Sequence, residues 1–425
     1  MADDHRHNGA SAAPLPFLRF GPCPDRTTCT GWQEWQLTRG LFVPAPRLSR
    51  AEFDALSPRG RSVHNLHRTA THVNMRLLET PMSAAVVEVM RDRIDNNALR
   101  FGPGTRDGMM ITGGGYQGKT ETVCEASADF EDFWKNLCRQ LNPAALPGTR
   151  DLFAPVAYCQ TPVRSTPMAL CEAILDFYHA PYGRNLRGMI RNVRASIRAH
   201  GTSVLLLDDI TRLKMHREDD QDTLDLIRDL MSLDVTLVLI GVNIPRSGLL
   251  REGWFDPRTQ QWVLPALKEG RSYNPDASTQ TERRFDLIEL APFDTTTSVG
   301  TTAFVEHLAG IDDQLRLFDA EPGILTGGDM PEYLYRRTHG VVGLLRRLIE
   351  DACTRAIRTG LETITTDLLE TITINLGNVP DRDPGAGEIP DVDLTPESTK
   401  RPPKKRKRVR NTVFDDPGTP AAAEA

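Results

Sequence analysis

A glycine-rich loop ending in Lys-Thr carries the clearest chemical signal in the sequence. The pattern GxxxxGK[ST] is matched by Gly113, Gly114, Gly115, Tyr116, Gln117, Gly118, Lys119 and Thr120. Glycines in such a loop let backbone N–H groups wrap phosphate oxygens, and a following helix adds the positive end of its dipole. Lys119 would reach the β- and γ-phosphates of ATP, and the Thr120 hydroxyl would join the Mg²⁺ shell. The alternative is a glycine-rich turn that happens to precede Lys-Thr.

A second candidate is an apolar segment that ends in two carboxylates. Residues 204–207 read Val-Leu-Leu-Leu, and Asp208 and Asp209 follow directly. The sequence has the form of a Walker B strand, which would place Asp208 near the metal. Carboxylate and hydroxyl oxygens are ligands that suit Mg²⁺. Asp208 and Thr120 are therefore the predicted metal-binding pair.

Strands and helices that could position these residues alternate along the middle of the chain. Apolar runs predict strands at 108–112, 153–159, 203–207, 235–241 and 285–290. Helical spacing predicts a helix from the glycine-rich loop to about 141 and further helices at 166–177, 186–200 and 220–233. Apolar strands separated by helices indicate a parallel sheet that is buried on both faces. The sequence therefore predicts an α/β protein, a P-loop αβα sandwich around a five-stranded parallel sheet.

The flanking regions differ from this core. Residues 1–45 are rich in Pro, Gly, Thr and charge and are expected to be irregular. Helices are expected from about 51, capped by Ser49, and at 82–96. After the last strand only helices are expected, at 301–308, 330–337, 341–359 and 367–375. The predicted divisions are an N-terminal extension over 1–80, a nucleotide-binding core over 81–296, a helical lid over 297–376 and a disordered basic tail over 377–425.

The charge and the cysteine content limit the class of protein that this sequence can represent. The formal charge is −6, but residues 400–410 carry eight basic side chains and no acid, which leaves an acidic body. The basic run could bind phosphate backbones, act as a nuclear localisation string, or only keep the chain soluble. The seven cysteines are scattered along the chain, so they do not indicate a disulfide framework, and they favour a reducing compartment. No signal peptide or spanning segment is expected, so the predicted location is cytoplasmic.

Three histidines lie near the start of the predicted helical region. His64, His67 and His72 fall at roughly helical spacing. No Cys or Glu stands in register with them, so a metal site is not expected there. We expect these histidines to be surface or contact residues.

The motifs resemble those of AAA+ ATPases, and the resemblance implies three further roles. Asp209 stands where these proteins usually carry the glutamate that polarises the attacking water, although it could instead cap the next helix. Asn243 stands at the polar sensor 1 position, or is a turn residue. Arg284, which we favour over Arg283, stands where an arginine finger reaches the γ-phosphate of a neighbouring subunit, or is a solvated helix end. The sensor 2 residue has two nearest candidates, Arg346 and Arg347.

Segments around these motifs are similar to the TniB/TnsC family of AAA+ regulators of DNA transposition, over about residues 46–376. The similar segments are 48–55, the Arg/His-rich 59–76, 78–82, 153–163 with Thr166-Pro167, 208–213 and 340–343. The resemblance implies a bacterial protein whose ATP-bound subunits form rings or filaments on duplex DNA. They would recruit a DDE-type transposase, and hydrolysis of ATP would drive disassembly.

Three features depart from that family's pattern. Asp209 is one methylene shorter than glutamate, which predicts slow hydrolysis that partners stimulate. Gly241-Val242-Asn243 replaces a more usual Gly-Thr, and the acidic body would need a local basic stripe to bind DNA. Candidates for that stripe, which could equally be a solvated face, are Arg212, Lys214, Arg217, Arg246 and Arg251. Two alternatives stay open: a scaffold that binds ATP without hydrolysing it, and an AAA+ loader or signalling ATPase unrelated to transposition.

Overall fold

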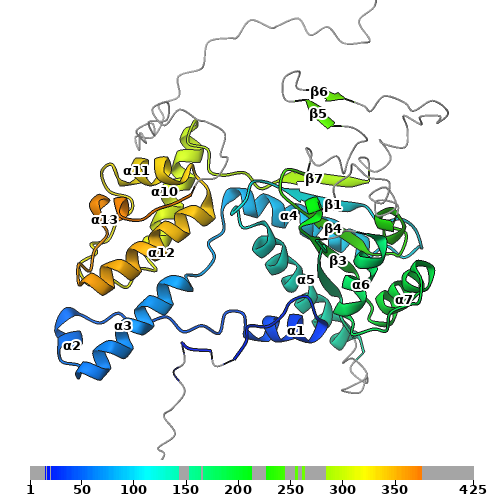
Figure 1. Cartoon of the computed structure of the whole chain (residues 1–425), viewed down its shortest axis with the longest axis horizontal. Coiled ribbons are helices and arrows are strands. Elements are labelled where there is room, and N and C mark those ends of the chain that lie inside the picture. The colour runs from blue at the N-terminus through cyan, green and yellow to red at the C-terminus, as the bar shows by residue number, and fades with distance from the viewer. Residues whose placement is uncertain are drawn as a thin grey trace, which may run out of the picture. The chain divides into compact units, whose positions relative to one another are not determined.

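Five parallel strands form the central sheet in the order β2-β3-β4-β1-β7 (Figure 1). Their bounds are Gly108–Thr112 for β1, Val156–Gln160 for β2, Val204–Asp208 for β3, Thr236–Ile240 for β4 and Phe285–Glu289 for β7. Every residue of β1, β3 and β4 is buried, because these inner strands have a neighbour on each side and helices over the sheet. The five predicted strands are confirmed.

Four helices between or before the strands cover this sheet. They are α4 (Pro81–Ala98), α5 (Lys119–Leu141), α6 (Pro167–Phe177) and α7 (Leu186–Ala199). Helix α4 contacts β1, β4 and β7, whereas α5 and α6 contact β2. Thr80 and Thr166 cap α4 and α6, and each is followed by a proline, which suits the first helical position. The predicted fold class, an α/β sandwich around a five-stranded parallel sheet, is confirmed.

The computed structural model describes residues 15, 17–19, 21–142, 153–163, 166–212, 226–244, 254–256, 261–263 and 284–375. The helix expected over 220–233 is described only from 226, and residues 226–230 are helical. The tail expected over 377–425 lies outside the described residues, as do Lys214, Arg217, Arg246 and Arg251. A two-stranded antiparallel sheet of β5 (Trp254–Asp256) and β6 (Gln261–Val263) is an element that the sequence does not predict.

A second group of helices follows the sheet. It contains α10 (Ser298–Asp312), α11 (Met330–Thr338), α12 (Val342–Thr359) and α13 (Thr366–Glu370). Its buried side chains, among them Phe304, Leu308 and Leu348, form a hydrophobic cluster separate from the one around the sheet. The four predicted helices are confirmed, although α13 ends five residues before the predicted 375 because residues 371–375 leave the helical conformation.

The N-terminal segment is more regular than the sequence predicts. Residues Cys29–Thr38 form the helix α1, so the expectation of irregular structure over 1–45 is wrong for this part. Helix α1 is held by tertiary contacts, since Trp32 is fully buried and its indole N–H donates to Glu131 Oε2 at 2.9 Å. Ser49 caps α2 (Arg50–Asp54) with a capping box, as predicted. Helix α3 (Pro58–Val73) packs against α12.

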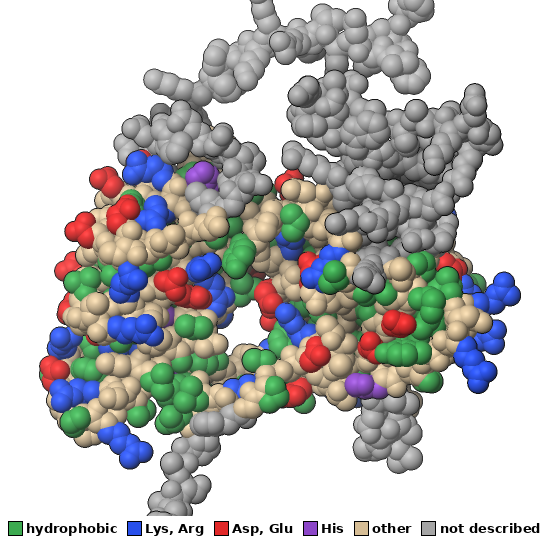
Figure 2. All heavy atoms as spheres, viewed as in Figure 1, with side chains coloured by type: hydrophobic (Ala, Val, Ile, Leu, Met, Phe, Trp, Pro, Cys, Tyr) green, Lys and Arg blue, Asp and Glu red, His purple; other side chains and the backbone are tan. Residues whose placement is uncertain are grey.

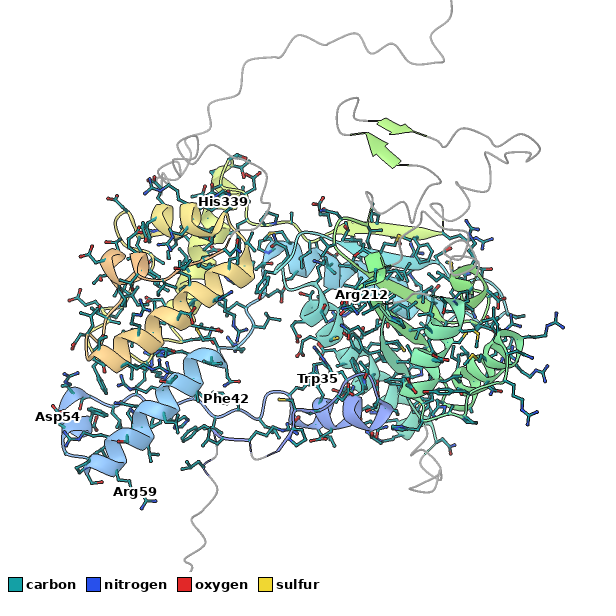
Figure 3. The ribbon with its side chains drawn as sticks, in the orientation of Figure 1. Trp35, Phe42, Asp54, Arg59, Arg212 and His339 are labelled. Carbon is teal, nitrogen blue, oxygen red and sulfur yellow. The ribbon has the colours of Figure 1, made fainter. Side chains whose placement is uncertain are left out.

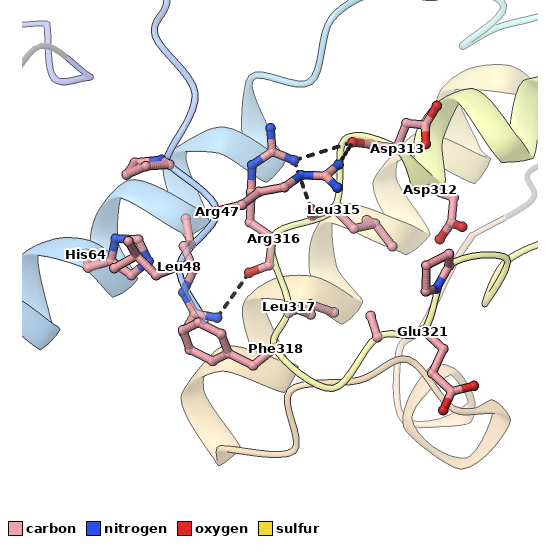
Figure 4. Close-up of a pocket in the computed structure, with 14 residues that line it drawn as sticks. Arg47, Leu48, His64, Asp312, Asp313, Leu315, Arg316, Leu317, Phe318 and Glu321 are labelled. Carbon is pink, nitrogen blue, oxygen red and sulfur yellow. Dashed lines mark hydrogen bonds between the residues drawn. The ribbon is translucent and has the colours of Figure 1, made fainter. Parts of the chain in front are cut away.

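A buried ion pair joins α3 to the segment after α12. Arg68 and Glu362 have side chains that are only 1% and 5% exposed, and Arg68 Nη2 lies 2.9 Å from Glu362 Oε1. The Arg68 guanidinium also stacks over the Phe318 ring, 4.1 Å from its centroid. A neighbouring cavity of about 150 Å³ is shown in Figure 4, where Arg47 and Arg316 both donate to the Asp313 carbonyl. These contacts connect α3 to the segment that follows α12.

His72 lies inside this junction, so the expectation that it is a surface or contact residue is corrected. Its side chain is fully buried, and its Nε2 accepts the backbone N–H of Arg316 at 2.9 Å. His64 is buried as well, whereas His67 is half-buried and its Nε2 contacts the Val43 carbonyl oxygen. Burial, with the nearby cations Arg68 and Arg316, lowers the pKa of His72 to about 3.

We expect acid to destabilise the protein through His72. The unfolded chain binds a proton at His72 below about pH 6.5, whereas the folded chain does so only near pH 3. The free energy of unfolding therefore falls as pH falls through this window, by about 2 kcal/mol per such group between pH 7 and 5. Urea unfolding at several pH values should show a shallower pH dependence for His72→Gln than for the wild type. His179→Gln, at an exposed histidine, should keep the wild-type slope, and equal slopes for all three proteins would contradict this account.

No helix among the described residues combines the length and the apolar character needed to cross a membrane.

Candidate nucleotide-binding site

The glycine-rich loop lies at the carboxyl end of β1, between that strand and the first turn of α5. Strand β1 is flanked by β4 and β7, and ligands of parallel α/β sheets bind at this edge. Gly118 has a φ of 83° and precedes α5 directly, which favours glycine. Gly113 has a φ of 152°, and a Cβ there would lie 2.3 Å from the Leu290 carbonyl oxygen. These two glycines are therefore required by the path of the loop.

Lys119 places a buried cation inside this loop. Its ammonium donates to the carbonyl oxygens of Gly113 and Gly114, at 3.2 and 2.5 Å. Burial lowers the pKa of Lys119, and the carboxylates of Asp208 and Asp209 oppose that shift. The hydrogen-bond partners of the ammonium are neutral carbonyls, so the charge is available for an anion. A phosphate group fits this arrangement.

Thr120 and Asp208 meet across the carboxyl ends of β1 and β3. The Thr120 hydroxyl donates to Asp208 Oδ2 at 2.9 Å, and the Asp209 backbone N–H donates to Asp208 Oδ1 at 2.8 Å. This is the pair that the sequence predicts as metal ligands. A hydroxyl and a carboxylate within hydrogen-bond distance of each other form a donor set that Mg²⁺ accepts. The structure thus brings together Lys119, Thr120 and Asp208.

Tyr158 is a residue of this site that the sequence analysis missed. Its hydroxyl donates to Asp208 Oδ2 at 2.8 Å from the neighbouring strand β2. Burial, together with the Asp208 charge, raises the pKa of Tyr158, which keeps the hydroxyl protonated as a donor. Asp208 is therefore oriented from three sides before any metal binds.

Asp209 lies beside Asp208 but its carboxylate is already paired. Asp209 has a φ of 54°, an uncommon conformation for a residue other than glycine. Its Oδ2 lies 2.8 Å from Arg212 Nη2 and accepts a hydrogen bond of 3.1 Å from Gln160 (Figure 3 labels Arg212). Gln160 is the last residue of β2, and the sequence analysis did not single it out. Both contacts are made to Oδ2, so Asp209 could act as a base only through Oδ1 or after losing one of these partners.

Asn243 and Arg284 lie at opposite ends of the sheet. Asn243 follows β4, which lies between β3 and β1, so its backbone is at the same edge as Asp208 and the loop. Arg284 directly precedes β7, and its carbonyl oxygen accepts the N–H of Gly108 at the start of β1. Arg284 is therefore at the far end of the strands from its own glycine-rich loop. The roles of both residues stay predictions.

A cleft of about 1050 Å³ adjoins the glycine-rich loop and is lined by Gln117, Gly118 and Thr122 together with Val342 and Arg346 of α12. The Gly343 N–H donates to the Tyr116 carbonyl oxygen at 2.9 Å, which connects α12 to the loop. The buried side-chain oxygen of Gln117 has no hydrogen-bond partner among the described residues. Of the two sensor 2 candidates, Arg346 lines the cleft, whereas Arg347 is exposed and 3.9 Å from Asp351.

The N-terminal segment attaches to the helix that begins at Lys119. Arg26 pairs with Glu121 at 2.8 Å, and its guanidinium lies over the rings of Trp35 and Tyr158. Arg39 donates to three carboxylates of α5, those of Glu125, Asp129 and Asp132, each at 2.8 Å. Figure 3 labels Trp35 on α1 near α5. The segment from Arg26 to Arg39 therefore contacts the part of α5 from Glu121 to Asp132.

Comparison with known proteins gives similarity at the level of the fold. No protein-family model matches the chain, and no curated protein matches it. Similar solved structures include the Aeropyrum pernix ORC1 protein in complex with DNA, with 15% identity over 71% of this chain and 68% of that chain and a TM-score of 0.46. The Aeropyrum pernix ORC2 protein in ADPNP–ADP complexes has 13% identity over 71% of this chain and 70% of that chain, with a TM-score of 0.44. Cdc6p from Pyrobaculum aerophilum has 12% identity over 69% of this chain and 67% of that chain, with a TM-score of 0.43. At these identities the functional argument depends on the chain's own site.

Proposed function

We propose that this chain is an ATPase that oligomerises on duplex DNA when ATP is bound and recruits a DDE-type transposase. The observation that carries the proposal is the convergence of Lys119, Thr120 and Asp208 at one edge of the sheet, within hydrogen-bond reach of the glycine-rich loop or of one another. Loop N–H groups and Lys119 would bind the phosphates, and Thr120 and Asp208 would hold Mg²⁺. The metal would neutralise phosphate charge there.

Assembly into a ring or filament is supported by the place of Arg284. This arginine precedes β7 at the end of the sheet away from its own loop, so an arginine finger at this position would serve a neighbouring subunit. An active centre shared between subunits links hydrolysis to assembly, because an isolated chain lacks the transition-state charge. Rings or filaments on duplex DNA would provide the neighbour.

A scaffold that binds ATP without hydrolysing it is the second candidate function. It is favoured by the pairing of Asp209 with Arg212 and Gln160, which leaves the proposed base engaged. Phosphate release measured with and without duplex DNA separates the two functions. A rate that stays at background with DNA present would favour the scaffold, whereas stimulation by DNA would favour the ATPase.

The first test is binding to a random-sequence duplex with ATP, with ADP and without nucleotide. We expect ATP-dependent binding, visible as rings or filaments by electron microscopy, and its loss in Lys119→Ala. Arg139→Ala is the matched control, because it removes an exposed cation from the same helix. Binding that ignores nucleotide and disappears when the chain is cut before residue 400 would assign DNA contact to the tail and overturn the proposal.

The transposition role rests on the resemblance of the flanking segments to the TniB/TnsC family and needs its own test. A gene for a DDE-type transposase beside the gene for this chain would supply the candidate partner. We expect that transposase to co-sediment with the ATP-bound protein on duplex DNA and to increase phosphate release. If it does neither, the ATPase would be a loader or signalling protein of another kind.

A further inference from the structure

Helix α7 carries a row of arginines that the nucleotide site does not use. Figure 2 shows Lys and Arg side chains gathered at the edge of the molecule where Figure 1 places α7. The helix contains no acidic residue, and its four arginines follow one another at intervals of four, three and four residues. They are Arg187, Arg191, Arg194 and Arg198, and Arg184 precedes the helix.

The row forms one face of the helix. At 3.6 residues per turn the four arginines lie within about 60° of one another and extend over about 16 Å along the axis. The opposite face is apolar and buried, with Met189, Val193 and Ile197 packed in the core around the sheet. Arg187, Arg191 and Arg198 are exposed, so their charges point away from that core.

Few contacts among the described residues account for these charges. Arg194 pairs with Asp229 at 2.6 Å, whereas Arg187, Arg191 and Arg198 have no ion pair among the described residues. Like charges three or four residues apart destabilise a helix, and cations near its first turn oppose the dipole. Arg187 and Arg191 therefore lower the stability of the helix without a compensating partner in the described part of the chain. Such an arrangement points to a partner outside it.

We propose that the arginine face of α7 binds the phosphate backbone of duplex DNA. The guanidinium fork matches phosphate oxygens, and a straight row of separated cations suits a surface that carries regularly spaced negative charge. An acidic protein is the less favoured partner, because protein interfaces are built on apolar anchors and no large hydrophobic side chain of α7 is highly exposed. The proposal rests on the DNA-binding function proposed above. It adds a surface of the folded core that contacts DNA independently of the basic tail.

The test compares two triple variants of the full chain with equal changes in charge. One is Arg187→Glu/Arg191→Glu/Arg198→Glu, and the control changes exposed arginines of α3, α5 and α12, as Arg59→Glu/Arg139→Glu/Arg358→Glu. Affinity for a random duplex with ATP is measured over a range of salt concentrations. We expect the α7 variant to bind more weakly and the slope of log K against log salt to fall in magnitude by about 3, since each phosphate contact contributes about 0.9. Arg187→Lys/Arg191→Lys/Arg198→Lys should keep most of the binding.

Four results would overturn the assignment, provided circular dichroism shows that the variants are folded. A wild-type slope in the α7 variant, or an equal loss in the control, would place the DNA contacts elsewhere while the proposed function stands. Loss of self-association without DNA, measured by sedimentation, would identify the face as a contact with an acidic surface of another copy. If the wild type binds no duplex under any nucleotide condition, the proposed function fails together with this surface.

Discussion

Arg284→Ala is expected to lower the turnover of ATP by about 10³-fold or more, as loss of an arginine finger does in related chemistry. Nucleotide affinity should change little, because Arg284 lies at the opposite end of the strands from its own loop. Strand β1 separates the two, and five residues of strand span about 16 Å. The measurement is steady-state phosphate release on duplex DNA, together with the binding of a fluorescent ATP analogue.

Mixing two inactive variants tests whether Arg284 acts on a neighbour. Lys119→Ala subunits keep Arg284, and Arg284→Ala subunits keep the nucleotide site, so some mixed interfaces are complete. We expect partial recovery of activity in the mixture and none in either variant alone. Arg100→Ala, at an exposed arginine between α4 and β1, is the control and should keep its rate. No recovery on mixing, or a normal rate in Arg284→Ala, would remove Arg284 from the active centre.

Arg68→Met should cost about 3–5 kcal/mol of unfolding free energy, because it leaves the buried Glu362 carboxylate without its partner. The two side chains are 1% and 5% exposed, so water cannot replace the lost contact. The double variant Arg68→Met/Glu362→Leu should recover much of the stability, since it buries no charge. Urea unfolding of the two variants and of Glu362→Leu alone gives the coupling between the residues.

Arg59→Met is the matched control for this cycle, since it makes the same substitution at an exposed position of the same helix. Its unfolding free energy should stay within about 0.5 kcal/mol of the wild type. If Arg68→Met is equally mild, the ion pair does not hold α3 to the segment after α12. Additive effects in the double variant would lead to the same conclusion.

The fold could be predicted because its signals are local. Each inner strand is a short apolar run, and the glycine-rich loop identifies the strand before it and the helix after it. The order of the strands in the sheet is not local, and the sequence analysis gave no order. The helix α1 was missed because its stability comes from Trp32 and Glu131, which are 99 residues apart. Gly31 and four threonines or tryptophans within it weaken any local helical signal.

The residues of the candidate site also differ in whether a local sequence signal predicts them. Lys119, Thr120 and Asp208 belong to sequence motifs, so their convergence follows from the fold. Tyr158 looks like any inner strand residue, and only the pairing of β2 with β3 shows that its hydroxyl reaches Asp208. His72 was expected to be a surface or contact residue, and its burial was not predicted because its hydrogen-bond partner, Arg316, is 244 positions away. Contacts of this kind depend on packing that a single sequence does not reveal.

The attachment of the N-terminal segment limits how this protein can be shortened or fused. A protein that starts at residue 81, where the predicted core begins, would lack Arg26, Trp32 and Arg39. The carboxylates of α5 would lose their counter-charges, and buried Glu131 would lose the indole that donates to it. Because α5 starts at Lys119, loss of these contacts would also disturb the nucleotide site. A shortened protein that keeps the nucleotide site intact should therefore retain residues 25–39.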